Sequence, residues 1–139
     1  MAVKQVNPYL LFNGKAEQAI KLYQSALGAR TESLSRFGEV QGTQFAPEHR
    51  NRVMHALLRI GVGVVMLSDT MPNEPVPTQG NVEVCLDFDD VGEMRTRFEA
   101  LSAGGKVRLP LQDTFWGATF GMLTDAFGIR WMLNCAKRG

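Results

Sequence analysis

The chain has 139 residues, 45% of them hydrophobic, and its 15 Lys and Arg against 14 Asp and Glu give a net charge of +1. This balance gives no electrostatic support for a nucleic-acid or anionic-membrane partner. The longest apolar run is far too short to span a bilayer, and the two cysteines lack the spacing of a zinc motif or a disulfide scaffold. We expect one cytoplasmic globular domain, residues 1–139, that binds neither nucleic acid nor membrane.

The first half of the chain begins with a predicted strand and a predicted helix. Residues 6–12 form a short apolar run of strand length, which ends at the turn pair Asn13-Gly14. From Ala16 onward, apolar residues recur at the three-and-four spacing of one helical face. Gly28 follows at the place where a left-handed residue closes a helix.

Three further strands and a connector are predicted after this helix. Residues 30–37 predict a strand, and the β-rich runs 54–60 and 64–68, which are separated by glycines, predict a hairpin. Residues 70–80 contain three prolines and predict a connector.

The second half predicts the same order of elements. Residues 81–88 predict a strand, and Asp90 with Glu93 has the spacing of a capping box at the start of an apolar helical stripe. Residues 106–109 predict a short strand, and residues 119–135 predict a final hairpin.

The two halves align as an internal repeat, in which Phe12 corresponds to Phe88. Each half reads as a strand, a helix and three strands, and such a unit cannot cover its own sheet. We therefore predict an α+β fold of two paired βαβββ modules, about residues 1–72 and 80–139. In this fold the modules form a curved, mostly antiparallel sheet around a cavity, with the helices on the convex side.

Four segments carry a resemblance to a known family. They are PYLLFNGKAEQAI at 8–20, VMHA at 53–56, QDTFWG at 112–117 and DAFGIRW at 125–131. In these segments the chain resembles the PhnB-like family of the vicinal oxygen chelate superfamily, which includes glyoxalase I, bleomycin resistance proteins and extradiol dioxygenases. The resemblance covers nearly the whole chain, and it implies paired βαβββ modules that assemble as a homodimer.

The resemblance also implies four places for the ligands of a divalent metal ion. In this chain the residues at these four places are Pro8, Met66, Glu83 and Met132. Only Glu83 suits a metal of this kind, because proline has no side-chain donor and a thioether is a poor ligand for hard or borderline cations. We therefore expect no metal and no cofactor, with a divalent metal ion as the alternative. The family usually has an acidic residue where this chain has Leu57, which makes the cavity more apolar.

PhnB-like sequences are also labelled as 3-demethylubiquinone 3-methyltransferases. A conventional methyltransferase holds S-adenosylmethionine at a glycine-rich turn that leads from a strand into a helix. Neither the 61–63 glycine pair nor the 104–105 pair opens a predicted helix. The residues themselves therefore give this label no support.

Four residues of the first hairpin are predicted to face the cavity. If Ile60 pairs with Gly63, Leu57 faces Met66 and His55 faces Ser68. His55 is then the candidate for proton transfer, since its ordinary pKa lies near neutrality. The alternative is a partly buried histidine whose hydrogen bonds are satisfied by Ser68 or by the backbone.

Two acidic residues share one face of the predicted strand 81–88. Glu83 and Asp87 are candidates, with His55, for acid–base catalysis or for half of a metal site. The alternative is that Asp87 simply pairs with Arg59 or Arg130.

An aromatic turn precedes the last hairpin. Phe115 and Trp116, with Trp131 on the return strand, are candidates for an aromatic wall of the cavity, and the alternative is core packing. We expect the ligand to contact a set of ten residues, namely Leu10, Phe12, His55, Leu57, Met66, Ser68, Glu83, Phe115, Trp116 and Met132.

Three functions remain open at this point. The first is a binding protein for a small apolar or aromatic molecule, without a tightly held catalytic metal. The second is a metal-dependent lyase, isomerase or dioxygenase in which the metal acts as a Lewis acid. The third is a methyltransferase that acts on a quinone precursor. We favour the first, because the implied metal ligands are missing and the expected cavity lining is apolar.

Overall fold

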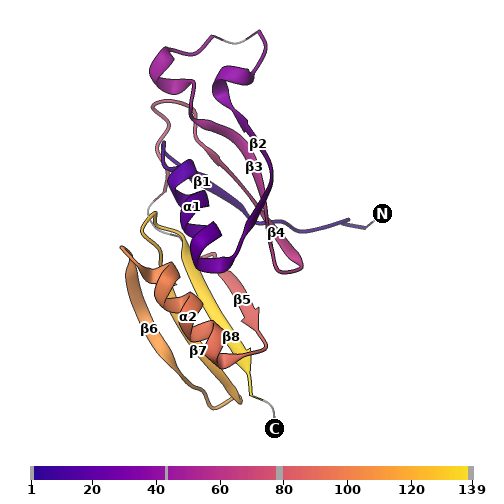
Figure 1. The fold of residues 1–139 in the computed structure, drawn as a ribbon, viewed down its shortest axis with the longest axis vertical. Coiled ribbons are helices and arrows are strands. Elements are labelled where there is room, and N and C mark those ends of the chain that lie inside the picture. Colours follow the sequence, from indigo (N-terminus) through magenta and orange to yellow (C-terminus); the bar gives the residue numbers. More distant parts are fainter. Residues whose placement is uncertain (1, 43, 78–79, 138–139) are drawn as a thin grey trace. The chain divides into compact units, whose positions relative to one another are not determined.

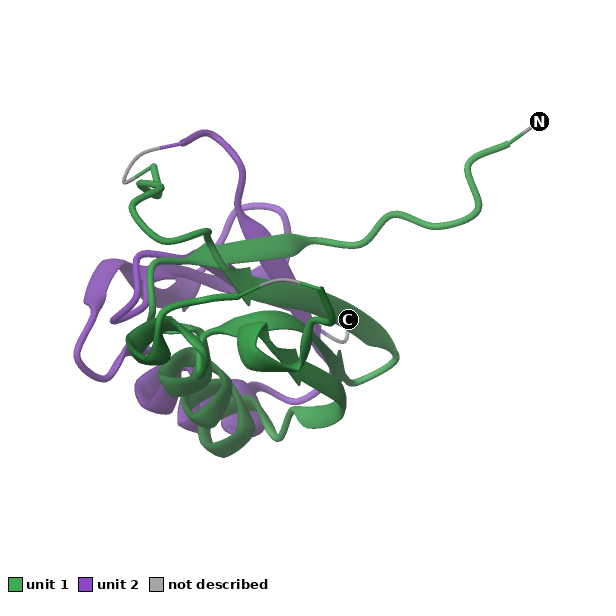
Figure 2. Cartoon of the chain, turned by 90° about the horizontal axis from the view of Figure 1, so that it is seen from above, with its two compact units in different colours: residues 1–77 green, residues 78–139 purple. Residues whose placement is uncertain are grey.

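The computed structural model describes residues 2–42, 44–77 and 80–137. It divides into two compact units, Met1–Pro77 and Thr78–Gly139, which are coloured separately in Figure 2. No helix of the described residues is long and apolar enough to cross a membrane. The predicted connector 70–80 includes residues 78 and 79, which lie outside the described residues.

The first unit is a four-stranded sheet with one α-helix (Figure 1). Its elements are β1 Tyr9–Phe12, α1 Ala16–Leu27, β2 Arg30–Arg36, the 3-10 turns Phe37–Glu39 and Pro47–His49, β3 Val53–Ile60 and β4 Gly63–Asp69. The strand order is β1-β4-β3-β2. The β1–β4 pair is parallel and the other two pairs are antiparallel.

The second unit repeats this topology. Its elements are β5 Val84–Phe88, α2 Val91–Ser102, β6 Lys106–Asp113, β7 Ala118–Thr124 and β8 Arg130–Ala136. The strand order β5-β8-β7-β6 matches that of the first unit, with a parallel β5–β8 pair and two antiparallel pairs. The prediction of an α+β fold with two βαβββ modules is therefore confirmed.

Each helix packs its apolar stripe on one face of the sheet of its own unit. In the first unit this layer contains the buried residues Ala19, Ile20, Tyr23, Leu58 and Leu67. In the second unit it contains Met94, Phe98, Leu101, Trp131 and Leu133. Within the described residues, the opposite face of each sheet carries no α-helix of its own unit, and we call it the open face.

The helix ends follow the predicted signals. Gly28 closes α1 in the left-handed conformation, with φ of 67°. The Asp90 side chain accepts a hydrogen bond of 2.7 Å from the Glu93 N–H at the start of α2. The start of α1 is held differently, because the buried Asp69 carboxylate accepts hydrogen bonds from the N–H groups of Ala16 and Val53 at 3.0 and 2.9 Å.

Three predicted strand boundaries were wrong by at least three residues, and several others by a single residue. β1 begins at Tyr9 rather than at residue 6, since Pro8 has no N–H to donate to the sheet. β5 begins at Val84 rather than at residue 81, and the preceding Val82 is exposed. β6 runs on to Asp113 instead of ending at residue 109, because an edge strand tolerates Pro110.

Candidate functional site

The first open face carries the hairpin residues in the predicted register. Ile60 pairs with Gly63 and Leu57 pairs with Met66 across β3 and β4. Strand alternation places His55 on the same face as Leu57, and Ser68 on the same face as Met66. The side chains of His55, Leu57 and Met66 are half-buried, and Ser68 is buried.

Strand β1 adds Tyr9 and Leu11 to this face. Its parallel register pairs Tyr9 with Met66 and Leu11 with Ser68. The Tyr9 ring lies 6.0 Å from the His55 ring, at an interplanar angle of 52°. Among the described residues the His55 ring makes no hydrogen bond. The structure therefore does not support the alternative in which Ser68 or the backbone satisfies the hydrogen bonds of this ring. The face combines apolar side chains with one imidazole and one phenol.

The placement of Leu10 and Phe12 corrects an expectation. Both were expected to line the ligand cavity, but they lie on the helix-covered face of the sheet and are 7% and 2% exposed. The pairing of Leu10 with Leu67, a core residue, shows the same orientation. The neighbouring Tyr9 and Leu11 take their place on the open face because side chains alternate along a strand.

Glu83 lies on the second open face between two arginines. Arg108 donates to its carboxylate at 2.6 Å and Arg130 at 3.2 Å. Burial alone would raise the pKa of Glu83, but the two hydrogen bonds and the positive charges outweigh it and hold this pKa below its ordinary value. Glu83 is therefore an ionised partner of arginine.

Arg108 reaches this site because of a β-bulge. The register of β6 against β7 shifts between Val107 and Leu109, which pair with Leu123 and Met122. A bulge re-aims the side chain of the extra residue. Arg108 accordingly donates from Nε to the Thr124 hydroxyl and from Nη2 to Glu83 and the Leu123 carbonyl.

Asp87 makes neither of the two ion pairs considered for it. It accepts a hydrogen bond of 3.2 Å from the Asn134 side chain, whereas Arg59 pairs with Glu32 and Arg130 pairs with Glu83. Cys85 lies between the two acids on the same strand face. Burial and the charge of Asp87 raise the pKa of its thiol, which argues against a nucleophilic thiolate.

The aromatic turn between β6 and β7 is exposed. Phe115 and Trp116 are 97% and 55% exposed, which rules out core packing for Phe115, and their rings meet at 5.0 Å and 90°. Trp116 also lies 5.7 Å from the ring of Phe120, which shares the open face of β7 with Met122. Trp131 is different: it is fully buried on the helix side, and its Nε1 donates to Asp125 at 2.9 Å.

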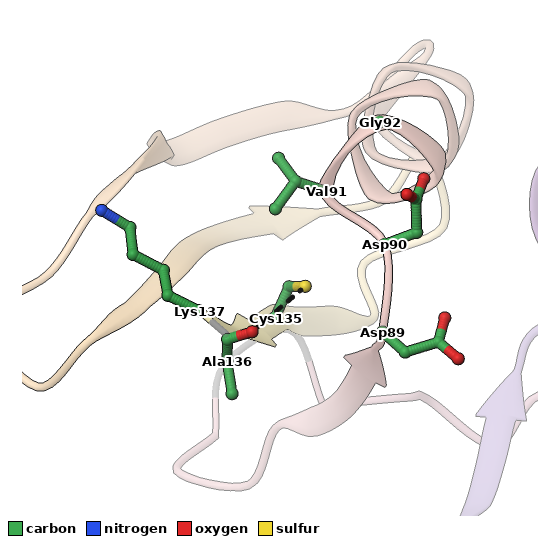
Figure 3. Close-up of a pocket in the computed structure, with 7 residues that line it drawn as sticks. All are labelled: Asp89, Asp90, Val91, Gly92, Cys135, Ala136 and Lys137. Carbon is green, nitrogen blue, oxygen red and sulfur yellow. Dashed lines mark hydrogen bonds between the residues drawn. The ribbon is translucent and has the colours of Figure 1, made fainter. Parts of the chain in front are cut away.

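A surface hollow lies at the start of α2, away from the predicted site. Figure 3 shows Asp89, Asp90, Val91 and Gly92 on one side of it and Cys135, Ala136 and Lys137 at the end of β8 on the other. The Asp90 carboxylate already caps the helix here. None of the residues expected to bind a ligand lines this hollow.

The residues at the implied metal places do not fit a divalent metal. The Pro8 carbonyl accepts a hydrogen bond from the Met66 N–H, and Glu83 is neutralised by two arginines. Met66 and Met132 offer only thioethers. Over the described ranges 2–42, 44–77 and 80–137, no three His, Cys, Asp or Glu side chains gather as metal ligands would.

Comparison with known proteins agrees with this fold. The chain belongs to the glyoxalase/bleomycin resistance protein/dioxygenase superfamily, whose profile matches residues 5–133. Within that superfamily it is PhnB-like. It is 37% identical to protein YjdN of Escherichia coli over 96% of both chains.

Two solved structures resemble this one closely. Protein PA1353 from Pseudomonas aeruginosa is 38% identical, with a TM-score of 0.87 over 98% of this chain and 100% of that one. A PhnB protein from Bacillus cereus, which carries a 3-demethylubiquinone-9 3-methyltransferase name, is 25% identical with a TM-score of 0.79 over 96% of this chain and 100% of its own.

Proposed function

We propose that this protein binds a small apolar or aromatic molecule on its open sheet faces, without a tightly held catalytic metal, as a cytoplasmic homodimer. The observation that carries the proposal is the first open face. Tyr9, Leu57 and Met66 present half-buried or exposed apolar surface there, next to the His55 ring. Apolar surface with a few polar groups is the usual lining of a small-molecule site.

The chemistry of this face favours binding over acid–base catalysis. His55 has an aromatic neighbour, and Ser68 is buried. Glu83 and Asp87 lie on the other unit and are engaged by arginine and asparagine side chains. A demethylubiquinone, the molecule in the name of the Bacillus cereus relative, carries a flat, uncharged quinone ring, which suits an apolar surface of this kind.

Titration with N-phenyl-1-naphthylamine, a neutral apolar dye whose emission rises in apolar surroundings, tests this proposal. We expect saturable binding to the wild-type protein. Leu57→Asp should weaken it at least tenfold, because the new carboxylate would stand beside Met66 on the first open face.

Val62→Asp is the matched control, since Val62 is fully exposed in the β3–β4 turn, and it should bind the dye like wild type. Circular dichroism melts of the three proteins show whether each is folded. Dye binding that is absent in wild type, or equal in a folded Leu57→Asp protein, would refute the proposed site.

A further inference from the structure

The cluster around Glu83 carries an excess positive charge. Two guanidinium groups, those of Arg108 and Arg130, share one carboxylate. The side chains of Arg108 and Glu83 are only 17% and 15% exposed. Water therefore screens the Arg108–Glu83 pair poorly, whereas Arg130, which is 38% exposed, presents the excess charge where an anion can reach it.

The two arginines are not equally satisfied. Arg108 donates to Glu83, to Thr124 and to the carbonyl oxygens of Leu123 and Trp131. Arg130 donates to Glu83 alone among the described residues, and its buried Nε–H finds no acceptor there. Because a buried donor without an acceptor costs free energy, a rotation of the Arg130 side chain that brings this N–H to an acceptor from outside the chain would be favourable.

The surroundings of Arg130 suit a ligand with an apolar body. Its side chain is 38% exposed, so a ligand can reach it. Met132, two residues further on the same face of β8, pairs directly with Met122 of β7. Methionine side chains adapt to irregular apolar shapes.

We propose that Arg130 binds the carboxylate group of a small apolar acid on the open face of the second sheet, with Arg108 and Glu83 as positioning residues. This inference deepens the proposed function and rests on it for the apolar part of the ligand. A monoanion balances the excess charge of the cluster, whereas a dianion such as a phosphonate would exceed it. A guanidinium and a carboxylate also match in geometry.

Calorimetric titration with 2-naphthoate and with the uncharged 2-naphthamide, which share one ring system, tests the inference. We expect wild type to bind the carboxylate at least tenfold more tightly than the amide. Arg130→Gln should reduce this ratio to about one, chiefly by weakening the binding of the carboxylate. Arg97→Gln, which removes the same charge from an arginine paired with Glu93 on helix α2, should keep the ratio.

Nitrogen NMR of the arginine Nε–H groups gives a second readout on the wild-type protein, in which a variant serves only to assign the signal. The Arg130 Nε–H signal, assigned with Arg130→Lys, should shift when 2-naphthoate is added to wild type and stay in place with 2-naphthamide. Equal binding of the two ligands, with no shift, would overturn this inference and leave the proposed function standing. Binding of neither would also overturn this inference, whereas the dye titration decides the proposed function. Tighter binding of 2-naphthylphosphonate than of 2-naphthoate would overturn the choice of a carboxylate.

Discussion

The ionisation of Glu83 depends on a balance between burial and hydrogen bonding. A carboxylate that is 15% exposed loses much of its hydration, which favours the neutral form. Hydrogen bonds from Arg108 and Arg130 favour the charged form and prevail, so the pKa lies below its ordinary value. The same balance makes Glu83 unfit as a metal ligand, since a metal would have to displace both guanidinium groups.

We expect Glu83→Gln to lower the free energy of unfolding by about 2 kcal/mol at pH 7, because it leaves two partly buried arginines without their carboxylate. A folded-state pKa below the unfolded value of about 4.3 means that the ionised group stabilises the fold above that pH. This contribution is lost as pH falls through the folded-state pKa. Urea unfolding of both proteins from pH 7 to pH 3 should therefore show the difference between them shrinking with acid.

Glu48→Gln is the control, since Glu48 is exposed in the 3-10 turn Pro47–His49. The Glu48→Gln substitution should change the free energy of unfolding little at any pH. A difference between wild type and Glu83→Gln that stays constant down to pH 3 would contradict the lowered pKa.

At the scale of residues, period-two alternation predicted one part of the site and missed another. Once Ile60 pairs with Gly63, alternation alone places His55, Leu57 and Met66 on one face. Alternation could not place Leu10, because residues 9–12 are all apolar and show no period of two. Arg108 could not be predicted, since the bulge that turns its side chain inward depends on pairing with β7.

The packing of α2 on the second sheet depends on the absence of a side chain at Gly121. A Cβ atom at this position of β7 would lie 2.8 Å from Leu111, 2.9 Å from the Phe98 ring and 3.1 Å from the Leu109 carbonyl oxygen. The two side-chain distances are shorter than real Cβ contacts, and the third, to a backbone atom, is tighter than most of them. The helix and the edge strand β6 can therefore approach β7 only across a glycine.

We expect Gly121→Ala to destabilise the protein by about 2 kcal/mol, the usual cost of overpacking a closely packed core. Gly63→Ala is the matched control, because its Cβ would meet only the Ile60 carbonyl at an ordinary 3.7 Å. Denaturant unfolding of the two variants measures the difference. Equal stability of both would show that β6 and α2 yield to the extra methyl group without cost.

At the scale of elements, the type and order of helices and strands were predictable and several of their ends were not. The signals that worked are local: Gly28 closes α1, and Asp90 caps α2. The strand β6 was predicted too short because Pro110 reads as a strand breaker unless the strand is known to lie at the sheet edge. The Asp69 carboxylate that holds the start of α1 comes from the end of β4, so no local pattern reveals it.

At the scale of the whole molecule, the repeat places different chemistry on two equivalent faces. The first open face combines Tyr9, His55 and Leu57 with apolar surface. The second holds Glu83 and its arginines beside two methionines. The topology of the two units is the same, so this divergence lies in the side chains that each sheet presents, which is where binding specificity is set.

The side chains at the implied metal places lead to a prediction about what the purified protein contains. Pro8, Met66, a neutralised Glu83 and Met132 do not hold a hard or borderline cation. We therefore expect a native mass spectrum of tag-free protein, purified without chelator, to show a homodimer without stoichiometric divalent metal. A retained small molecule is expected as an extra mass that denaturation releases.

A parallel sample treated with chelator is the control, and its subunit mass should be unchanged. One divalent ion per subunit that chelator removes would contradict the metal-free interpretation. It would require the Glu83 carboxylate to leave Arg108 and Arg130 and would give the metal-dependent lyase, isomerase or dioxygenase precedence. An unmodified mass without any ligand would contradict the expected retention, and dye titration would then decide whether the open faces bind a small molecule.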